Sequence, residues 1–528
     1  MSFSGRLTAF LAALCCNAYI VIASTSSSSI WPLPAEVDSS GWPGVIHEGF
    51  DITTDSQSPR LHKAIARYRQ WIRPSMLEDL TVQDRIANAN GTGLDSLYLA
   101  VSNHNETLNA ATSYAYRLSV EGGKGHVTAD TIYGAMYALE SLSQVVDDGK
   151  LMVEKLRVRD FPRYRHRGFM IDTGRRFFPK QLVLEMLDAM SYFKLNVLHF
   201  HLSDYCRFAV ESLVFPELTA HSDGFYRQDE IREIVEYAAD RGIRVVPEFD
   251  FPGHSRGLLP LANRSVTFCS ESNVQLHNDL DGRTVATLKA LLSEMATLFP
   301  DKLFHIGCDE TRVTDTCPLV MTRKMEQELQ QHLAGLGKTP VGWEEILFSS
   351  KAALPGTVIN TWKMESASQA TAADYQAVAS SLPHFYVNYV STTYDKLWTD
   401  IGASVPAKQH SLLLGGEFSM WSDNYCYRLQ CFMNGTKPVA WWMYGRGEDK
   451  VFRSSVTAMI WPRGIVAAGA FWNFQAGLDA QSQDFLQLYH RQTERLMARG
   501  IDSCPVGCKC DELTQCGVPY PRPPPSGP

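Results

Sequence analysis

The sequence has no excess of positive charge. Its 49 Lys and Arg residues are outnumbered by 57 Asp and Glu residues, which gives a formal net charge of −8. A nucleic-acid binding protein needs a basic face that displaces counterions from phosphates, so this balance argues against that class of protein. Charged residues make up only 20% of the chain and hydrophobic residues 45%, which is ordinary globular usage and excludes a disordered or fibrous chain.

Long hydrophobic runs are also scarce. A mostly apolar segment covers residues 7–23, with Val21 and Ala23 placed like a small-residue cleavage site. This pattern predicts a secretory signal peptide over residues 1–23. A single membrane anchor is the competing interpretation, but the run is short for a spanning helix. No later segment is long and apolar enough to cross a bilayer, so we expect no membrane span after the signal peptide is removed.

The cysteines fit a chain that enters the secretory pathway. Removal of Cys15 and Cys16 would leave ten of the twelve, an even number that suits disulfides in an oxidising compartment. We therefore expect a secreted or a lysosomal or vacuolar protein. In the Cys- and Pro-rich tail, residues 501–528, we expect local disulfides rather than a zinc knuckle, because the chain is expected to be secreted and the cysteine spacing fits no common zinc pattern well. The sequence also contains four N-glycosylation sequons, at Asn90, Asn105, Asn263 and Asn434.

Hydrophobic patterning divides the remaining chain into two parts. Residues 24–160 hold alternating apolar pieces and one helical stretch over 131–146, which predicts an α+β domain. Over residues 161–500, short apolar runs alternate with amphipathic helices, at 180–193, 229–241 and 284–299 among others. The runs are 168–171, 195–202, 243–249, 303–306, 340–343, 358–362, 385–390 and 412–420. Eight runs joined by helices favour an α/β fold with a (β/α)8 TIM barrel, although periodicity alone does not separate it from an open doubly wound sheet.

Unusual polar residues collect where the predicted strands end, which is where the active sites of such barrels lie. Adjacent carboxylates at Asp309 and Glu310 follow the fourth run. Their environments can drive the two pKa values apart, so that one group stays protonated as a general acid while the other stays anionic. Other polar residues at strand ends are Asp172, Arg175, His199, His201, Asp204, Glu248, Asp250, His254, Glu417 and Asp423. Trp343, Trp362 and Trp421 are candidates for an apolar box around a sugar ring, with core packing as the alternative for each.

The histidines allow a second interpretation. His199 and His201 share one face of a strand, and His254, His305 and Asp309 are candidates to complete a metal site of the kind that metal-dependent barrel hydrolases use. Inward-facing histidines also simply fill barrel interiors.

Several motifs together resemble one enzyme family. Residues 305–310, His-Ile-Gly-Cys-Asp-Glu, resemble the His-x-Gly-Gly-Asp-Glu signature of the family-20 glycoside hydrolases, the β-N-acetylhexosaminidases. Further matching motifs follow in the family's order at 166–175, 195–204, 243–254, 415–421 and 460–463. The segment from Trp31 through 131–146 resembles the α+β domain that precedes the family's barrel. The resemblance covers nearly the whole chain after the signal peptide.

The resemblance implies an exo-acting, retaining β-N-acetylhexosaminidase that removes terminal β-linked GlcNAc or GalNAc from glycoconjugates or chitooligosaccharides. In this family the substrate's own 2-acetamido oxygen attacks the anomeric carbon and forms an oxazolinium ion, an exception to the two-carboxylate scheme. Glu310 is implied as the general acid and then the base, and Asp309 as the group that orients the acetamido N–H and stabilises its charge. His254 and Asp204 are implied to hold Glu310 in place. The family uses no metal or organic cofactor, and a homodimer is an expectation from it.

The resemblance also implies how the sugar is bound. Arg167 is implied to bind the 3- and 4-hydroxyls, because a guanidinium fork suits vicinal oxygens. Asp423 is implied to reach the 4- or 6-hydroxyl, with Asp400 as a weaker candidate. Trp398 occupies the position of a tyrosine that contacts the acetamido carbonyl in the family. The implied sugar-enclosing residues are Trp343, Trp362 and Trp421, and the implied disulfide joins Cys269 and Cys317.

Three residues depart from the family's pattern. Cys308 replaces the second glycine of the signature, Tyr205 follows Asp204 where the family usually has another Asp, and Trp398 replaces the tyrosine. Cys308 and Trp398 keep open a non-catalytic N-acetylhexosamine-binding protein on the same scaffold. The disulfide state of Cys206 and Cys308 also stays open.

Overall fold

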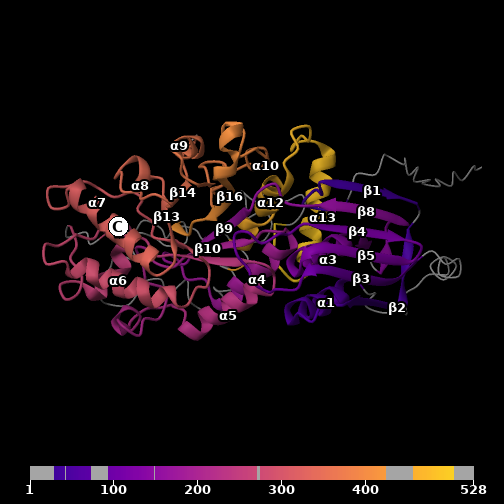
Figure 1. Cartoon of the computed structure of the whole chain (residues 1–528), viewed down its shortest axis with the longest axis horizontal. Helices are drawn as coiled ribbons and strands as arrows, with labels where there is room; N and C mark the ends of the chain where they lie inside the picture. The colour runs from indigo at the N-terminus through magenta and orange to yellow at the C-terminus, as the bar shows by residue number, and fades with distance from the viewer. Residues whose placement is uncertain are drawn as a thin grey trace, which may run out of the picture.

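A computed structural model describes residues 29–41, 43–72, 93–147, 149–269, 274–364, 366–389, 391–423, 453 and 456–504. The predicted signal peptide, the sequons at Asn90 and Asn434 and the cysteines after Cys504 lie outside these residues. Figure 1 shows a β-sheet part and a barrel part side by side, with α12 (Arg463–Asn473) and α13 (Gln483–Ala498) between them.

Among its described residues, the N-terminal part is an eight-stranded sheet with two helices on one face, which agrees with the predicted α+β domain (Figure 1). The strand order is β1-β8-β4-β5-β3-β2-β7-β6. The strands are β1 (Glu36–Ser40), β2 (Gly44–Thr54), β3 (Gly93–Asn103), β4 (Tyr116–Glu121), β5 (Lys124–Thr131), β6 (Val146–Asp147), β7 (Lys150–Leu151) and β8 (Lys155–Asp160), and the helices are α1 (Pro59–Ile72) and α3 (Ile132–Gln144). Every residue of α3 is buried, and its Tyr137 hydroxyl donates to the carbonyl of Leu195 in the barrel part, two residues before its second strand. This helix therefore joins the sheet to the barrel.

The second part is a closed barrel of eight parallel strands, which confirms the predicted TIM-type fold. The strands are β9 (His166–Asp172), β10 (Val197–His201), β11 (Arg244–Glu248), β12 (Leu303–His305), β13 (Thr339–Trp343), β14 (Val358–Thr361), β15 (Ala377–Ala379) and β16 (Leu413–Met420), and β16 closes the barrel against β9. The helices after them include α4 (Lys180–Tyr192), α5 (Gln228–Ala239), α6 (Arg283–Ala296), α7 (Leu319–Gly335), α8 (Glu345–Phe348), α9 (Ser366–Ala372) and α10 (Tyr394–Leu397), with 3-10 turns η2 (Pro216–Leu218), η3 (Ser255–Leu261) and η4 (Ala407–Leu412).

Seven of the eight predicted runs coincide with barrel strands, and the run at 385–390 is wrong. The seventh strand is Ala377–Ala379, which is too short and too small in side chain to stand out as an apolar run. Phe385 and Val387 are buried beside it, because the segment after β15 bonds irregularly to β16: Ser419 N donates to Phe385 O at 2.7 Å and Val387 N donates to Ser419 O at 3.0 Å.

Two layers inside the barrel prepare the site. An apolar ring of Val197, Val246, Leu303, Val341, Val358 and Val378 fills the part nearer the amino ends of the strands. Above this ring, the last residues of the strands are polar, with His201, Glu248 and His305 ending β10, β11 and β12. Buried charge therefore gathers at the carboxyl end of the barrel. Within the described part of the chain, no helix combines the length and apolar character needed to cross a bilayer.

Candidate active site

A sharp turn after β12 presents two adjacent carboxyl groups at the carboxyl end of the barrel. Gly307 has φ +70°, and a Cβ on it would lie 1.7 Å from Asp250 Oδ1, so only glycine fits there. Cys308 and Glu310 also have positive φ values, 78° and 49°, although neither is glycine. Asp309 lies between these two strained residues. Such backbone strain persists only where the surrounding structure holds it, and it is concentrated at functional sites.

The two carboxyl groups have different surroundings. The Asp309 side chain is 14% exposed and that of Glu310 is 61% exposed. Burial raises the pKa of Asp309, and its Oδ1 is buried without a hydrogen-bond partner among the described residues. The hydrogen bond with His254 lowers the pKa of Glu310. These two shifts run in the opposite sense to an acid at Glu310 and an anion at Asp309.

His254 connects both carboxyl groups to the barrel interior. Its Nε2 lies 3.3 Å from Glu310 Oε2 and 3.5 Å from Asp309 Oδ2, and its Nδ1 lies 3.4 Å from Asp204 Oδ1. Burial lowers the pKa of His254, but the charges of Asp309 and Asp204 outweigh burial and raise it well above its usual range. His254 therefore faces three carboxyl groups, whose negative charge favours its protonated form.

The histidines that were candidates for a metal site, His199, His201 and His305, are paired with buried carboxylates. Glu248 accepts from His201 Nδ1 at 2.5 Å and from Trp343 Nε1 at 2.7 Å, and lies 2.9 Å from His199 Nε2 and 3.2 Å from His305 Nδ1. The other ring nitrogen of His201, Nε2, forms a hydrogen bond with Asp204 Oδ2 at 2.8 Å. Glu417 and Glu248 outweigh the effect of burial and raise the pKa of His199 to about 9. His199, Glu248 and His305 are close enough to share a cation, and the same atoms already lie within ion-pairing distance of one another.

Arg175, for which the sequence analysis proposed no role, lies at the centre of the site. Its guanidinium reaches Asp172 at 2.9 Å, Asp204 at 3.0 Å and Asp423 at 3.3 Å. It also lies over the ring of Trp421, 5.1 Å from the centroid. Arg175 is the last residue of the motif at 166–175 and follows β9, so its position at the carboxyl end of the strand was the signal that could have identified it.

Aromatic rings line the same end of the barrel. The Trp343 and Trp421 rings lie 5.8 Å apart, and Tyr386 meets Trp421 edge-on at 6.1 Å. Trp362 is half-buried and donates from Nε1 to Glu345. The structure therefore brings Trp343 and Trp421 together and places Trp362 directly after β14, at the same end of the barrel. It adds Tyr386, which could not be foreseen because it falls in the wrongly predicted run at 385–390.

The expectation for Arg167 is wrong. Arg167 lies near the amino end of β9, is fully buried, and donates to the carbonyls of Lys194 at 2.9 Å and Tyr164 at 2.7 Å. Its guanidinium stacks on Tyr114 of the N-terminal part and on Trp472 of α12. The side chain therefore joins the two parts of the molecule, at the end of the barrel opposite the site.

Trp398 and Asp400 also lie away from the site. Trp398 packs 5.5 Å from the ring of Trp31 and donates from Nε1 to Leu478 O at 3.0 Å. Asp400 pairs with Arg163 at 3.0 Å, before the start of β9. Their loop turns toward the amino end of the barrel, so neither residue can bind a ligand at the carboxyl end.

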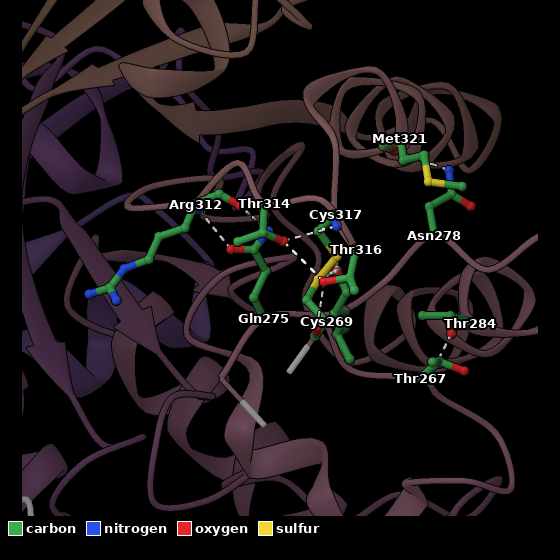
Figure 2. Close-up of a disulfide and its surroundings, with 11 residues drawn as sticks. Thr267, Cys269, Gln275, Asn278, Thr284, Arg312, Thr314, Thr316, Cys317 and Met321 are labelled. Carbon is green, nitrogen blue, oxygen red and sulfur yellow. Dashed lines mark hydrogen bonds between the residues drawn. A yellow bond between two sulfur atoms is a disulfide. The ribbon is translucent and has the colours of Figure 1, made fainter. Parts of the chain in front are cut away.

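The cysteines in the described residues divide as follows. Cys269 and Cys317 form a disulfide, with Cα atoms 5.6 Å apart, that joins the loop after β11 to the loop after β12 (Figure 2). Cys206 and Cys504 each take part in a further disulfide, whereas Cys308 is a buried free thiol.

Comparisons with known proteins agree with this arrangement. The model of the glycosyl hydrolase family 20 catalytic domain matches residues 164–475, and a model described as beta-acetyl hexosaminidase like matches residues 30–145. The Homo sapiens beta-hexosaminidase subunit beta is 27% identical over 535 residues, which cover 90% of this chain and 88% of that protein. The Bos taurus beta-hexosaminidase subunit alpha is 29% identical over 443 residues, 74% of this chain and 76% of that protein.

Solved structures share the fold. The Flavobacterium johnsoniae chitobiase superposes with a TM-score of 0.73 at 23% identity, covering 90% of this chain and 73% of that one. A Streptomyces plicatus beta-hexosaminidase mutant in complex with GlcNAc gives a TM-score of 0.70 at 22% identity, covering 91% of this chain and 97% of that one. Because the family-20 model spans more than half of the sequence, the chain belongs to glycosyl hydrolase family 20 and is a glycoside hydrolase of the β-N-acetylhexosaminidase type.

Proposed function

We propose that the protein is an exo-acting, retaining β-N-acetylhexosaminidase that hydrolyses terminal non-reducing β-linked GlcNAc or GalNAc with the help of the substrate's acetamido group. One observation carries the proposal. Asp309 has a buried, unpartnered Oδ1, and the neighbouring Glu310 on the same turn has an exposed carboxyl, and both contact His254. A buried acceptor and an exposed proton donor are what this chemistry requires side by side.

In the first step, the acetamido N–H donates to Asp309 and the acetamido oxygen attacks the anomeric carbon. Glu310 gives its proton to the leaving oxygen as the glycosidic bond breaks, which leaves an oxazolinium ion beside the Asp309 carboxylate. In the second step, Glu310 takes a proton from water, and the water oxygen attacks the anomeric carbon and opens the oxazolinium ring. Two displacements at one carbon retain its configuration.

Substrate binding changes the charge state in the required direction. A sugar over the site removes water from the 61% exposed Glu310 carboxyl, and desolvation raises the pKa of a carboxylic acid. The positive charge that develops on the acetamido group favours the ionised form of Asp309. Both effects therefore oppose the shifts that burial gives to Asp309 and that His254 gives to Glu310.

The surrounding residues suit the sugar. Arg175 and Asp423 present a guanidinium and a carboxylate that lie 3.3 Å apart, as donors and acceptors for ring hydroxyls. Trp343, Trp362 and Trp421 provide apolar faces for the acetamido methyl and the ring. Asp204, at 3.4 Å from His254 Nδ1, orients the imidazole that contacts Glu310.

The setting of the enzyme is part of the proposal. The predicted signal peptide, the sequons and the disulfide support a secreted or a lysosomal or vacuolar protein. Asn105 and Asn263 are exposed, as N-glycosylation requires. The ends of β8 at Asp160 and of α13 at Ala498 support the domain boundaries expected after residues 160 and 500. The relatives are named as subunits, which supports an oligomeric enzyme, and we propose a homodimer.

The test is hydrolysis of a chromogenic N-acetyl-β-glucosaminide by the wild type with and without a chelator, beside Glu310→Gln and Asp309→Asn. We expect chelator-resistant turnover that falls by about 10²-fold or more in each variant, the scale of a lost acid or a lost charge stabiliser. Binding without turnover would instead identify a lectin-like protein, and loss of activity on chelation would identify a metal-dependent hydrolase.

A further inference from the structure

The loop that carries Glu310 is held by one glutamine side chain. Arg312 N donates to Gln275 Oε1 at 2.7 Å, and Gln275 Nε2 donates to Arg312 O at 2.9 Å (Figure 2). The Gln275 side chain thus pairs with both polar groups of one backbone residue, as a neighbouring strand would. Gln275 itself is only 7% exposed. This pair of bonds fixes the position and the orientation of the backbone two residues after Glu310.

The segment that contains Gln275 is also bound to the loop that carries His254. Leu276 N donates to Pro252 O at 2.8 Å, and Ser255 N donates to Val274 O at 3.0 Å. The residues on either side of Gln275 are therefore bonded to residues on either side of His254. Gln275 joins the His254 loop to the Glu310 loop, so it helps to set the separation between the imidazole and the carboxyl, which is 3.3 Å.

The disulfide completes this support. Cys269 N donates to Gln275 O at 2.9 Å, Thr316 Oγ1 donates to Cys269 O at 2.6 Å, and Cys269 is bonded to Cys317 (Figure 2). The far end of the Glu310 loop is therefore tied to the same segment. The disulfide holds that loop at residue 317, whereas Gln275 holds it at residue 312, nearer to the carboxyl.

The catalytic turn needs such support because its backbone is strained. At the start of the turn, Cys308 N donates to Asp250 Oδ1 at 3.2 Å. Among the described residues, the next backbone N–H along the chain that donates a hydrogen bond is that of Arg312, to Gln275. Glu310, with φ 49°, lies between these two points. Without the second point, the turn is free to relax toward an unstrained conformation that moves the carboxyl.

We propose that Gln275 is a positioning residue, which holds the Glu310 carboxyl where it can protonate the leaving oxygen. The inference rests on the proposed function, because it assigns Gln275 to the acid step of that reaction. The acid matters most when the leaving group is a poor one. Loss of Gln275 therefore harms the cleavage of an N-acetylglucosamine disaccharide and spares an aryl glycoside whose phenolate leaves without a proton.

The experiment compares kcat/KM of the full-length enzyme on two substrates, the β-1,4-linked N-acetylglucosamine disaccharide and 2,4-dinitrophenyl N-acetyl-β-glucosaminide. Gln275→Leu removes both bonds to Arg312 with little change in volume. General acid catalysis contributes about 10²- to 10⁴-fold, so a partly misplaced acid should lower kcat/KM on the disaccharide by roughly 10- to 100-fold. On the dinitrophenyl substrate, which needs no acid, we expect a change of less than about 3-fold.

Gln330 provides the matched control. It is fully buried in α7 and holds another loop in the same manner, with Leu354 N donating to its Oε1 at 2.9 Å and its Nε2 donating to Ala352 O at 3.0 Å. Gln330→Leu should lower the melting temperature and change kcat/KM on the two substrates by the same factor. If Gln275→Leu does not fold, Gln275→Glu replaces it, because the carboxylate keeps the bond from Arg312 N and loses the one to Arg312 O.

The outcomes separate the inference from the function on which it rests. A fall on the disaccharide alone supports positioning by Gln275. The inference is overturned if Gln275→Leu lowers kcat/KM equally on both substrates, or if the folded variant lowers it on neither. Glu310→Gln is the reference, because it should lower kcat/KM much more on the disaccharide than on the dinitrophenyl substrate. If Glu310→Gln also cleaves the disaccharide normally, the proposed function itself fails.

Discussion

Two buried arginines near opposite ends of the same strand test which end of the barrel binds the sugar. Arg175 follows β9 at the carboxyl end and contacts three carboxylates, whereas Arg167 near the amino end contacts backbone carbonyls and aromatic rings. We compare Arg175→Lys with Arg167→Lys. Both changes keep the positive charge and remove the planar fork, so the two variants differ in location rather than in chemistry.

The magnitude follows from the contacts. The Arg175 guanidinium reaches Asp172, Asp204 and Asp423 within 3.3 Å, and an ammonium group cannot keep this geometry and also bind a sugar hydroxyl. A hydrogen bond to a charged group contributes about 1.5–3 kcal/mol. Loss of one such bond in the transition state should lower kcat/KM by roughly 10- to 150-fold.

The assay is kcat/KM on 4-nitrophenyl N-acetyl-β-glucosaminide, with thermal unfolding measured on the same samples. Arg167→Lys loses its stacking on Tyr114 and Trp472, so we expect a lower melting temperature with kcat/KM within about 2-fold of the wild type. The reverse result, with catalysis lost in Arg167→Lys and kept in Arg175→Lys, would refute the placement of the sugar site.

Three further predictions concern stability. Burial raises the pKa of Glu326 to about 8, so the stability that its protonated form contributes is complete below about pH 4.5 and is lost progressively as the pH rises to 8. The free energy of unfolding in urea should therefore be about 3–4 kcal/mol higher at pH 5 than at pH 8 on account of this group, a difference that Glu326→Gln removes. The disulfide between Cys269 and Cys317 spans a sequence separation of 48, so replacing both residues by Ser should lower the free energy of unfolding by about 4 kcal/mol, and an unchanged urea midpoint would contradict this. Asp160→Asn leaves the Lys194 ammonium, 2.8 Å away and fully buried, without its counter-charge; we expect about 3–5 kcal/mol of destabilisation by thermal unfolding, with normal kcat/KM below the melting temperature.

Part of the site could be predicted because it is local in the sequence. Asp309 and Glu310 are neighbours in one motif, and the turn that carries them follows directly from the end of β12. His254 and Asp204 also lie a few residues after strand ends. Such residues reach the same end of a parallel barrel whatever the details of packing.

Longer segments could not be placed in this way. The motif at 166–175 contains two arginines, and the strand between them rises about 3.3 Å per residue, so they reach opposite ends of the barrel. The choice between Arg167 and Arg175 depends on the direction of β9 relative to the site. Trp398 and Asp400 belong to a loop whose course is decided by packing against Trp31 and Arg163, which lie more than 200 residues earlier in the chain.

The sequence by itself determined the α+β part and the enzyme family, and through the family it predicted the barrel and the proposed catalytic pair, because periodicity and short motifs depend on neighbouring residues. Only the tertiary structure decided that Arg175 replaces Arg167 at the site, that the histidines pair with Glu248 and Glu417, and that Gln275 joins the loops of His254 and Glu310. These are contacts between residues far apart in the chain. The closed barrel and its packed loops bring these residues together, and a local sequence pattern carries no information about such long-range contacts.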